Sequence, residues 1–255
     1  MKGVQIVFSP TSGTQKVADS IVAGWGIPVT KIDLTNAEIN DSDFLLQKDD
    51  MVLIAVPSYG GRVPVLAAQR LANIHGNQAR CVIVCVYGNR AYEDTLIELK
   101  DIADQCDFQI IAAISAIAEH SIMHQYATGR PDQRDKDELS AFGKKILDKI
   151  GNYDLSAPLT PIPGKHPYKK AGSAGLVPKA DKKCISCGLC ADKCPAQAIN
   201  KENIKIADSK KCISCMRCIA QCPKSARRVN GAMVSVAALA IKKACSERKE
   251  NELFI

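Results

Sequence analysis

The sequence lacks any apolar run long enough to cross a membrane. No stretch reaches the roughly 18 consecutive apolar residues that a transmembrane helix needs, and the longest candidate, Ala232–Ile241, is too short. The N-terminus has one lysine before its first apolar run and lacks the leader pattern of an exported protein. We therefore expect a cytoplasmic protein with no membrane insertion.

Several common nucleotide-binding motifs are also missing. The chain contains neither the G-x4-G-K-[ST] loop that cradles ATP phosphates nor the G-x-G-x-x-G fingerprint of dinucleotide-binding proteins. No helix-turn-helix pattern stands out, and a basic half alone does not establish nucleic-acid binding. We expect no nucleic acid among the partners.

Charge and cysteine are plentiful but unevenly distributed. Residues 1–150 carry 15 Lys and Arg against 19 Asp and Glu, a net charge of −4, whereas residues 151–255 carry 19 against 8, a net charge of +11. Three of the twelve cysteines precede residue 150 and nine follow it. Two domains of different chemistry are the simplest explanation of this split.

The boundary between the two halves is rich in proline. Residues 152–180 hold five of the twelve prolines, and proline removes backbone donors and blocks helix formation. Such a segment is typical of an extended linker. We therefore divide the chain into a first domain at 1–151, a linker at 152–180, a cysteine-rich domain at 181–231 and a helical extension at 232–255.

The cysteine-rich domain contains an internal repeat. "CISCGLCADKCPAQAI" starts at Cys184 and "CISCMRCIAQCPKSAR" starts at Cys212, with eight of sixteen positions identical. Each copy reads C-x2-C-x2-C-x3-C-P, the spacing of bacterial [4Fe-4S] proteins, in which the fourth cysteine ligates the other cluster. We therefore expect two [4Fe-4S] clusters, one held by Cys184, Cys187, Cys190 and Cys222 and the other by Cys212, Cys215, Cys218 and Cys194.

Zinc and disulfides are the competing explanations of this cysteine pattern. Zinc sites normally use two C-x2-C pairs with a long spacer, not four cysteines in eleven residues repeated twice. A disulfide framework requires an oxidising compartment, and nothing in the sequence points to export. The remaining cysteines, Cys81, Cys85, Cys106 and Cys245, follow no ligand spacing, and we expect them to be buried in packing.

The first domain alternates between strand-like and helix-like segments. Apolar runs that lack a polar face alternate with helical patterns near 14–24, 64–74, 92–105 and 135–150. This pattern predicts an α/β fold with a parallel sheet covered on both sides, in the doubly wound order 2-1-3-4-5. The five predicted strands are Val4–Phe8, Val29–Leu34, Met51–Val56, Cys81–Tyr87 and Phe108–Ile117.

A hydroxyl-rich loop follows the first predicted strand. A loop that leads from a strand into a helix presents free backbone N–H groups, and such a helix N-terminus binds anions. Hydroxyl groups can donate further hydrogen bonds to phosphate, and a glycine lets the backbone approach it closely. The residues that we expect to bind a phosphate are Ser9, Thr11, Ser12, Gly13 and Thr14.

Two further loops follow the third and fourth predicted strands. Both "PSYGGRVPV" at 57–65 and "YGNRAYEDTLIEL" from Tyr87 place an aromatic residue beside glycine and then an arginine. An aromatic ring can stack on a flavin, glycine N–H groups can reach its polar edge, and arginine can stabilise a reduced-flavin anion. The candidate flavin contacts are Tyr59, Gly60, Gly61, Arg62, Tyr87, Gly88, Asn89, Arg90 and Tyr92.

These loops and the cysteine repeat resemble known redox proteins. The hydroxyl-rich loop resembles the FMN phosphate loop S-x-T-G-x-T of flavodoxins, although Ser12 stands where glycine is usual, and residues 181–230 resemble a bacterial two-cluster ferredoxin. With "AIAEHSI" at 116–122 and "GRPDQRD" at 129–135, the chain to about residue 230 resembles the flavodoxin–ferredoxin fusion family. This resemblance implies a flavodoxin-like FMN domain followed by a ferredoxin-like α+β domain with two [4Fe-4S] clusters.

Two residues outside these loops have two readings each. His120 follows the fifth predicted strand, where it can protonate a reduced flavin or a substrate, but a local hydrogen bond is the better-supported expectation. Asp132 precedes the last predicted helix of the first domain and is most simply an N-cap or a first-turn acid.

Clusters and a flavin on one chain leave three functions open. The first is an electron carrier that exchanges single electrons between its clusters and FMN and serves redox partner proteins. The second is an oxidoreductase whose FMN reduces a small-molecule acceptor, such as a quinone, a nitro compound or a flavin. The third is a redox or iron sensor whose clusters switch a partner interaction.

Overall fold

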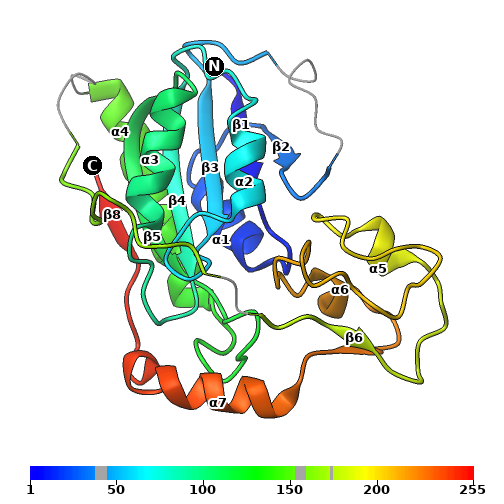
Figure 1. Cartoon of the computed structure of the whole chain (residues 1–255). Helices are drawn as coiled ribbons and strands as arrows, with labels where there is room; N and C mark the ends of the chain where they lie inside the picture. Colours follow the sequence, from blue (N-terminus) through cyan, green and yellow to red (C-terminus); the bar gives the residue numbers. More distant parts are fainter. Residues whose placement is uncertain (38–44, 153–158, 173–174) are drawn as a thin grey trace.

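The computed structural model describes residues 1–37, 45–152, 159–172 and 175–255. The chain forms a sheet domain from its N-terminal half and a smaller cysteine-rich domain beside it (Figure 1). Residues 153–158 and 173–174 of the predicted linker lie outside the described residues. Within the described ranges, no helix combines the length and apolar character needed to span a bilayer.

Five parallel strands form the centre of the sheet domain, in the predicted order. The sheet runs β2-β1-β3-β4-β5-β8, and neighbouring strands from β2 to β5 are parallel. The apolar runs form strands because each is covered on both faces, and only the edge strand β2 exposes most of its side chains. The parallel strands are β1 (Gly3–Val7), β2 (Val29–Asp33), β3 (Met51–Pro57), β4 (Arg80–Tyr87) and β5 (Gln109–Ile117).

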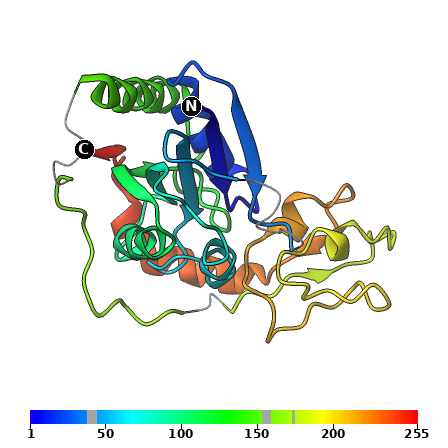
Figure 2. The same ribbon diagram turned by 90° about the horizontal axis from the view of Figure 1, so that it is seen from above.

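Helices cover both faces of this sheet (Figure 2). On one face α2 (Val65–Leu71) and α3 (Thr95–Gln105) pack Leu71 and Leu99 into one hydrophobic cluster. On the other face α1 (Gly13–Ala23) and α4 (Gln133–Asn152) contribute to a second cluster. The layers place the loops after β1, β3, β4 and β5 together at one edge of the sheet.

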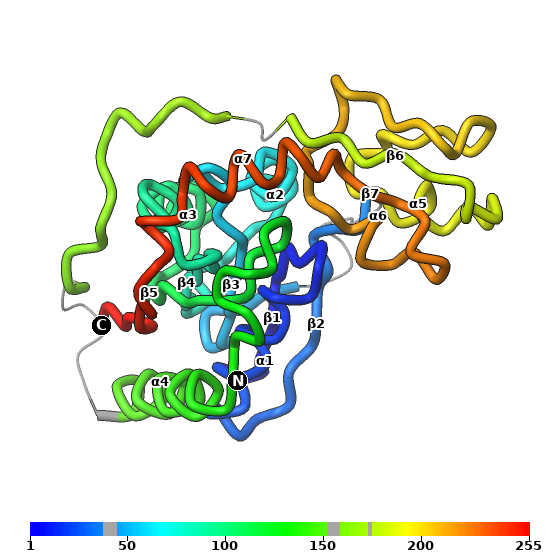
Figure 3. The backbone as a smooth tube through the Cα atoms, turned by 90° about the horizontal axis from the view of Figure 1, so that it is seen from below, coloured from blue at the N-terminus to red at the C-terminus, as the bar shows by residue number. Residues whose placement is uncertain are grey.

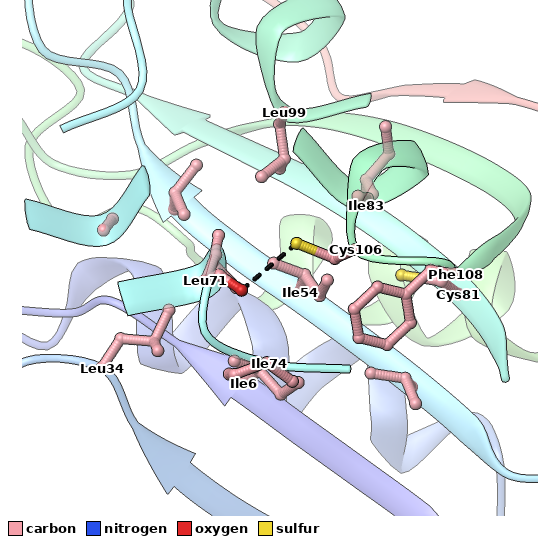
Figure 4. Packing of buried hydrophobic residues seen from close by; sticks show 14 of the residues in the cluster. Ile6, Leu34, Ile54, Leu71, Ile74, Cys81, Ile83, Leu99, Cys106 and Phe108 are labelled. Carbon is pink, nitrogen blue, oxygen red and sulfur yellow. Dashed lines mark hydrogen bonds between the residues drawn. The ribbon is translucent and has the colours of Figure 1, made fainter. Parts of the chain in front are cut away.

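The cysteines without ligand spacing belong to the core, as the sequence predicts. Cys81, Cys85 and Cys106 are buried, and Cys245 is buried in the C-terminal segment. Figure 4 shows Cys81 and Cys106 among the aliphatic side chains between the sheet and its helices. The Cys106 thiol donates a hydrogen bond to the carbonyl of Leu71 at 3.2 Å. These thiols fill space in the core and have no redox partner among the described residues.

The C-terminal segment adds a sixth strand that the sequence analysis did not predict. After α7 (Gly231–Ile241) and the short helix η2 (Lys243–Cys245), the chain returns to the sheet as β8 (Glu252–Phe254). β8 pairs antiparallel with β5 through residues 113–115. The sheet therefore has five parallel strands and one antiparallel edge strand, and the extension is helix followed by strand rather than helix alone.

The cysteine-rich domain consists of two short helices and a two-stranded ribbon. α5 (Leu189–Asp192) and α6 (Arg217–Ala220) occupy equivalent positions in the two copies of the repeat. β6 (Lys179–Ala180) pairs antiparallel with β7 (Arg227–Arg228) and closes the domain. Elements this short follow from ligand loops that are wrapped around cavities rather than packed on a large core.

The described part of the linker lies against α3. The Asp94 carboxylate, at the N-terminus of α3, accepts hydrogen bonds from the backbone N–H groups of Lys165 at 3.0 Å and Lys169 at 2.7 Å. Two turns further along the helix, Asp101 pairs with His166 at 2.6 Å. The linker is extended, as the proline content predicts, but it is fastened to the sheet domain.

Candidate functional site

The eight spaced cysteines surround two cavities. Each cavity is lined by three cysteines of one repeat copy and the fourth cysteine of the other. The structure thus brings together the same two sets that the spacing groups. We call Cys184, Cys187, Cys190 and Cys222 the distal set. We call Cys212, Cys215, Cys218 and Cys194 the proximal set.

The lining of both cavities suits a cluster site better than a single-ion site. Each is lined by its four cysteines together with apolar side chains and one arginine, Arg227 at the first cavity and Arg217 at the second. Across the described ranges, no three His, Cys, Asp or Glu side chains converge as a lone metal ion requires. Four thiols around a shared space suit a cubane, whose four irons each need one thiolate, better than tetrahedral zinc.

Each set also offers a backbone hydrogen bond to sulfur. The N–H of Ala198 donates to Cys194 Sγ at 3.3 Å, and the N–H of Ala226 donates to Cys222 Sγ at 3.2 Å. Ala198 and Ala226 occupy equivalent positions in the repeat, so both sites share this feature. Hydrogen bonds to cluster sulfurs are one of the factors that set a reduction potential.

The proximal loop contains two buried polar atoms without a partner. Ser214 Oγ and Arg217 Nε make no hydrogen bond within the described chain although both are buried. Arg217 lines the proximal cavity, and Ser214 lies between Cys212 and Cys215. Buried donors normally find an acceptor, and the sulfurs of a bound cluster are acceptors of the right kind. The proximal site therefore fits an iron–sulfur group.

Burial governs the protonation of the proximal thiols. It raises the pKa of Cys215 to about 11 and that of Cys218 to about 12. At Cys222, which belongs to the distal set, burial also raises the pKa, but the backbone N–H groups of Ala226, Lys224 and Arg227 outweigh this effect and lower the pKa. Because only thiolates ligate iron, loading the proximal set must release protons.

The loop between β1 and α1 has the geometry of an anion site. Within the described chain, the backbone N–H groups of Ser12, Gly13 and Thr14 donate to no protein acceptor. Ser12 adopts a left-handed conformation with φ of 69°, and the Ser9 hydroxyl accepts the N–H of Gln15 at 3.0 Å. Free N–H groups at the start of an eleven-residue helix suit a phosphate. Thr11 completes the loop, and Thr14 is buried against the sheet.

The loop after β3 forms a tight turn stabilised by its two glycines. Tyr59 and Arg62 exchange backbone hydrogen bonds at 2.9 and 3.3 Å, and the intervening Gly60 and Gly61 have φ of 62° and 87°. A Cβ on Gly61 would lie 1.9 Å from a carboxylate oxygen of Glu93, so only glycine fits there. The turn directly follows β3, at the edge of the sheet where the parallel strands end.

The side chain of Arg62 is engaged within the protein. Its guanidinium makes two hydrogen bonds of 2.7 Å to the buried carboxylate of Glu98 and a third, of 2.5 Å, to the carbonyl of Lys169. It also lies over the ring of Tyr168, 4.8 Å from the centroid. Arg62 therefore fastens the linker to α3, and its predicted contact with a flavin remains a prediction.

The loop after β4 is bound to the C-terminal segment. The amide of Asn89 donates to the carbonyls of Cys245 at 3.1 Å and Glu247 at 2.7 Å. Tyr87 is buried and packs edge to face with Tyr92 at 5.2 Å. The remaining candidate, Arg90, pairs with Glu93 at 3.1 Å. These side chains hold neighbouring segments, whereas the backbone of the loop stays at the edge of the sheet.

His120 makes a local contact, as the sequence analysis favours. Its Nδ1 accepts the backbone N–H groups of Ile122 and Met123, both at 3.2 Å. Burial, and next the proximity of His124, lower the pKa of His120. The ring lies against Gly88, where a Cβ would approach it to 2.7 Å. His120 thus packs the loop after β5 against the loop after β4.

Asp132 is the N-cap that the sequence predicts. Its Oδ1 accepts the N–H of Asp135 at 3.0 Å, and Asp135 Oδ2 accepts the N–H of Asp132 at 2.9 Å. This reciprocal pair fixes the start of α4. Asp135 is fully buried and also pairs with Arg130 at 2.5 Å, while Arg248 of the C-terminal segment reaches both carboxylates.

α7 crosses the edge of the sheet where the parallel strands end (Figure 3). The hydroxyl of Tyr126, in the loop after β5, donates to the carbonyl of Ala238 at 2.6 Å. Arg130 donates to the carbonyl of Lys249 at 2.8 Å, and Asn251 accepts the N–H of Ile117 at 3.0 Å. Together with Asn89, these contacts join the loops after β4 and β5 to the C-terminal segment.

The proximal set adjoins the candidate flavin loops. Arg217 donates to the carbonyl of Ser9 at 3.4 Å and lies 3.6 Å from Asp33, at the end of β2. Ile213 packs against the hydrophobic cluster of the sheet domain. Burial, and next the Cys215 thiol, raise the pKa of Tyr59. The distal set lies farther from the sheet, as the positions of α6 and α5 relative to α1 show (Figure 1).

Sequence reasoning did not identify the residues that join the two domains. Arg70 of α2 donates to the carbonyl of Pro195 at 2.6 Å, and Arg217 reaches Ser9 and Asp33. A comparison of the two repeat copies offers a signal, because Met216 and Arg217 replace Gly188 and Leu189 within otherwise similar motifs. No local pattern marks Arg70.

A comparison with known protein families concerns the cysteine-rich domain. Residues 176–227 match the family model described as "4Fe-4S dicluster domain". No curated protein matches the chain in sequence. The match covers the cysteine-rich domain and supports iron–sulfur chemistry there.

Solved structures similar to the chain include flavodoxins. A flavodoxin from the domain Archaea aligns with 60% of this chain and 100% of its own, at 12% identity and a TM-score of 0.45. A Streptococcus pneumonia TIGR4 flavodoxin aligns with 57% of this chain and 98% of its own, at 18% identity and a TM-score of 0.42. Rubredoxin oxygen:oxidoreductase from Desulfovibrio gigas aligns with 61% and 37%, at 15% identity and 0.44. The strand order β2-β1-β3-β4-β5 itself defines a flavodoxin-like doubly wound fold.

Proposed function

We propose that this chain is an electron-transfer protein that holds two [4Fe-4S] clusters and FMN and passes single electrons between them. The observation that carries the proposal is the contact of Arg217, which lines the proximal cavity, with the carbonyl of Ser9 in the loop that leads into α1. Two redox sites built side by side on one chain have a use when electrons pass between them. The resemblance to the flavodoxin–ferredoxin fusion family supports the same function.

Each group has a proposed set of contacts. The distal and proximal sets ligate one cluster each, the N–H groups of residues 12–14 hold the FMN phosphate, and the turn at Tyr59–Gly61 lies against the flavin ring. The clusters supply one-electron transfer, and FMN supplies transfer of one or two electrons. The protein holds these groups close together and tunes them, and no substrate of its own is required.

Several residues of the chain organise this site. Arg217 brings a positive charge to the junction between the proximal cavity and the Ser9 loop. The contacts of Asn89, Tyr126 and Arg130 with the C-terminal segment fix the loops after β4 and β5 at the edge of the sheet. Fixed loops reduce the reorganisation that accompanies a change of charge. These side chains are positioning residues, since none of them carries an electron.

Cofactor analysis of protein purified without oxygen tests the proposal. We expect about eight irons and eight acid-labile sulfides per chain, together with one FMN released on denaturation. The protein should be brown and should lose its visible absorption on reduction. Zinc in place of iron, or full iron with no flavin, would contradict the proposed function.

A further inference from the structure

The internal repeat allows the surroundings of the two cysteine sets to be compared position by position. Cys215 is buried whereas its counterpart Cys187 is exposed, and Ile213 packs against the sheet domain whereas Ile185 is 59% exposed. The sequences around them are nearly the same, so the difference comes from the sheet domain. The sheet domain covers the second copy, and the first copy faces solvent.

A ring of unpaired lysines borders this exposed loop. Lys182 and Lys183 precede Cys184, and Lys224 follows Pro223 at the rim of the distal cavity; all three are exposed. No acidic side chain of the described residues pairs with these lysines. The nearest carboxylates in the sequence are occupied elsewhere, because Asp181 lies 3.5 Å from Arg228 and Asp192 pairs with Lys201 at 2.7 Å.

We propose that this exposed loop, with Ile185 and Cys187 at its centre and Lys182, Lys183 and Lys224 around it, is the docking surface for an acidic electron-transfer protein. The inference rests on the proposed function and adds the partner to it. One electron leaves the reduced centre of the partner and enters the cluster of the distal set, so the partner is oxidised and the cluster reduced by one electron each. The proximal set then stands between this surface and the flavin loops.

The composition of the surface favours a protein partner. An apolar side chain at the centre with charges at the rim is the common arrangement of a protein–protein interface, and the rim charges speed association with a partner of opposite sign. The surface is small, which suits the brief encounters of redox proteins. Nucleic acid would contact the lysines through phosphates and would leave Ile185 without a partner.

The repeat also supplies a matched control for the test. Lys210 and Lys211 precede Cys212 as Lys182 and Lys183 precede Cys184, and all four are exposed. K182E/K183E and K210E/K211E therefore change the net charge equally but at different sets. The probe is an acidic two-cluster bacterial ferredoxin, and the primary measurement is its Kd for each variant at low and high salt.

We expect K182E/K183E to weaken ferredoxin binding at least tenfold at low salt and K210E/K211E to change it less than twofold. A substitution of the central side chain, Ile185→Ser, should weaken binding at high salt as well, because its contribution is not screened. Equal weakening by both lysine pairs, or none by K182E/K183E, would overturn the proposal. Tighter binding of duplex DNA than of ferredoxin, lost in K182E/K183E, would also overturn it.

Failure of this inference can be distinguished from failure of the proposed function. Iron, sulfide and flavin contents of each variant, and its reduction by the photogenerated deazariboflavin radical, report on the cofactors without the docking surface. If the cofactor contents and the reduction match those of the unaltered protein while K182E/K183E leaves the Kd for ferredoxin unchanged, only the docking surface is wrong. If the unaltered protein itself lacks clusters or flavin, the proposed function is wrong.

Discussion

Met216 illustrates how the two copies of the repeat differ at a single residue. It has φ of 61°, in the left-handed region, where the equivalent residue of the first copy is Gly188 with φ of 83°. A non-glycine residue there costs about 1–2 kcal/mol. Burying its side chain, which is 3% exposed, contributes about 1.5–3 kcal/mol and offsets that cost. The second copy therefore keeps a strained residue because the burial of its side chain at the proximal cavity compensates for the strain.

The pairing of cysteines between the two copies can be tested with double variants. If Cys222 completes the distal set, C187A/C222A removes two ligands of one cluster, and about four irons should remain per chain. If Cys194 completes the proximal set, C187A/C194A damages both sites, and iron should fall close to zero. Iron and sulfide analysis after anaerobic purification gives the answer. The opposite pattern would show that each motif ligates its own cluster.

The phosphate site at the start of α1 leads to a second prediction at this scale. Ser12→Glu places a carboxylate among the free N–H groups of residues 12–14, where it competes with a phosphate, so FMN affinity should fall at least a hundredfold. Ser20→Glu introduces the same charge farther along α1 and serves as control. Fluorescence titration of the flavin-free protein with FMN measures both. Unchanged affinity in Ser12→Glu would place the phosphate elsewhere, and cluster content should be unchanged in both variants.

Among the elements, the C-terminal segment is short but makes several contacts with the sheet domain. β8 extends the sheet, and the segment between α7 and β8 is fixed by the buried pair of Arg130 and Asp135 and by Asn251. Removing one partner of a buried ion pair leaves an uncompensated charge, which is far more costly than losing a surface pair. The segment therefore depends on a few polar contacts rather than on a large apolar interface.

Two neighbouring arginines allow the loss of a buried ion pair to be compared with the loss of an exposed one. Arg130→Met leaves Asp135 buried with only part of its partners and should lower the free energy of unfolding by about 3–5 kcal/mol. Arg134→Met removes an exposed pair with Glu250 and should cost less than about 1 kcal/mol. Denaturant titration of both variants, with the cofactors bound, measures the difference. Similar losses in the two variants would mean that the buried pair is not a main contact of the segment.

The buried ion pair of Arg130 and Asp135 also predicts that the stability of the fold depends on pH. Burial raises the pKa of Asp135, but the hydrogen bonds from Arg130 and the Asp132 backbone outweigh it, so the net shift is downward. A carboxylate with a lowered pKa stabilises the fold above its unfolded pKa of about 3.9, and this stabilisation is lost as the pH falls through the lower folded value.

The stability gap between the unaltered protein and Asp135→Asn should therefore be constant from pH 7 to about pH 5 and should narrow below about pH 4. Asp137→Asn, at an exposed position of the same helix, is the control and should show a small gap at every pH. A gap for Asp135→Asn that widens in acid would contradict the assignment of a charged carboxylate at this position.

The elements that the sequence predicts are those whose pattern is local. Strands such as Met51–Pro57 are apolar throughout because both faces are covered, and the cysteine spacing alone groups the ligands. β8 has three residues and pairs with a strand more than a hundred positions away, so no local pattern could reveal it. For the same reason the partners of Arg62, Asn89 and Arg130 were beyond sequence reasoning, since each is fixed by a distant segment.

In the whole molecule, the opposite charges of the two halves meet at a defined interface. The −4 half and the +11 half are joined by Arg217 with Asp33 and by Arg70 with Pro195, and the linker is fastened along α3. This arrangement holds the proximal set beside the loop that begins at Ser9 and leaves Cys187 of the distal set exposed. In the proposed function, the exposed side of the cysteine-rich domain receives electrons and the loops at the edge of the sheet hold the flavin that stores them.

The most direct test of the account is the kinetics of flavin reduction within one molecule. Anaerobic holoprotein is mixed in a stopped-flow instrument with reduced acidic ferredoxin, and cluster and flavin absorption are followed separately. After the clusters are reduced, we predict a flavin phase whose rate constant is unchanged over a tenfold range of protein concentration. A flavin rate proportional to protein concentration would mean that electrons pass between molecules, and the proposed internal transfer would be wrong.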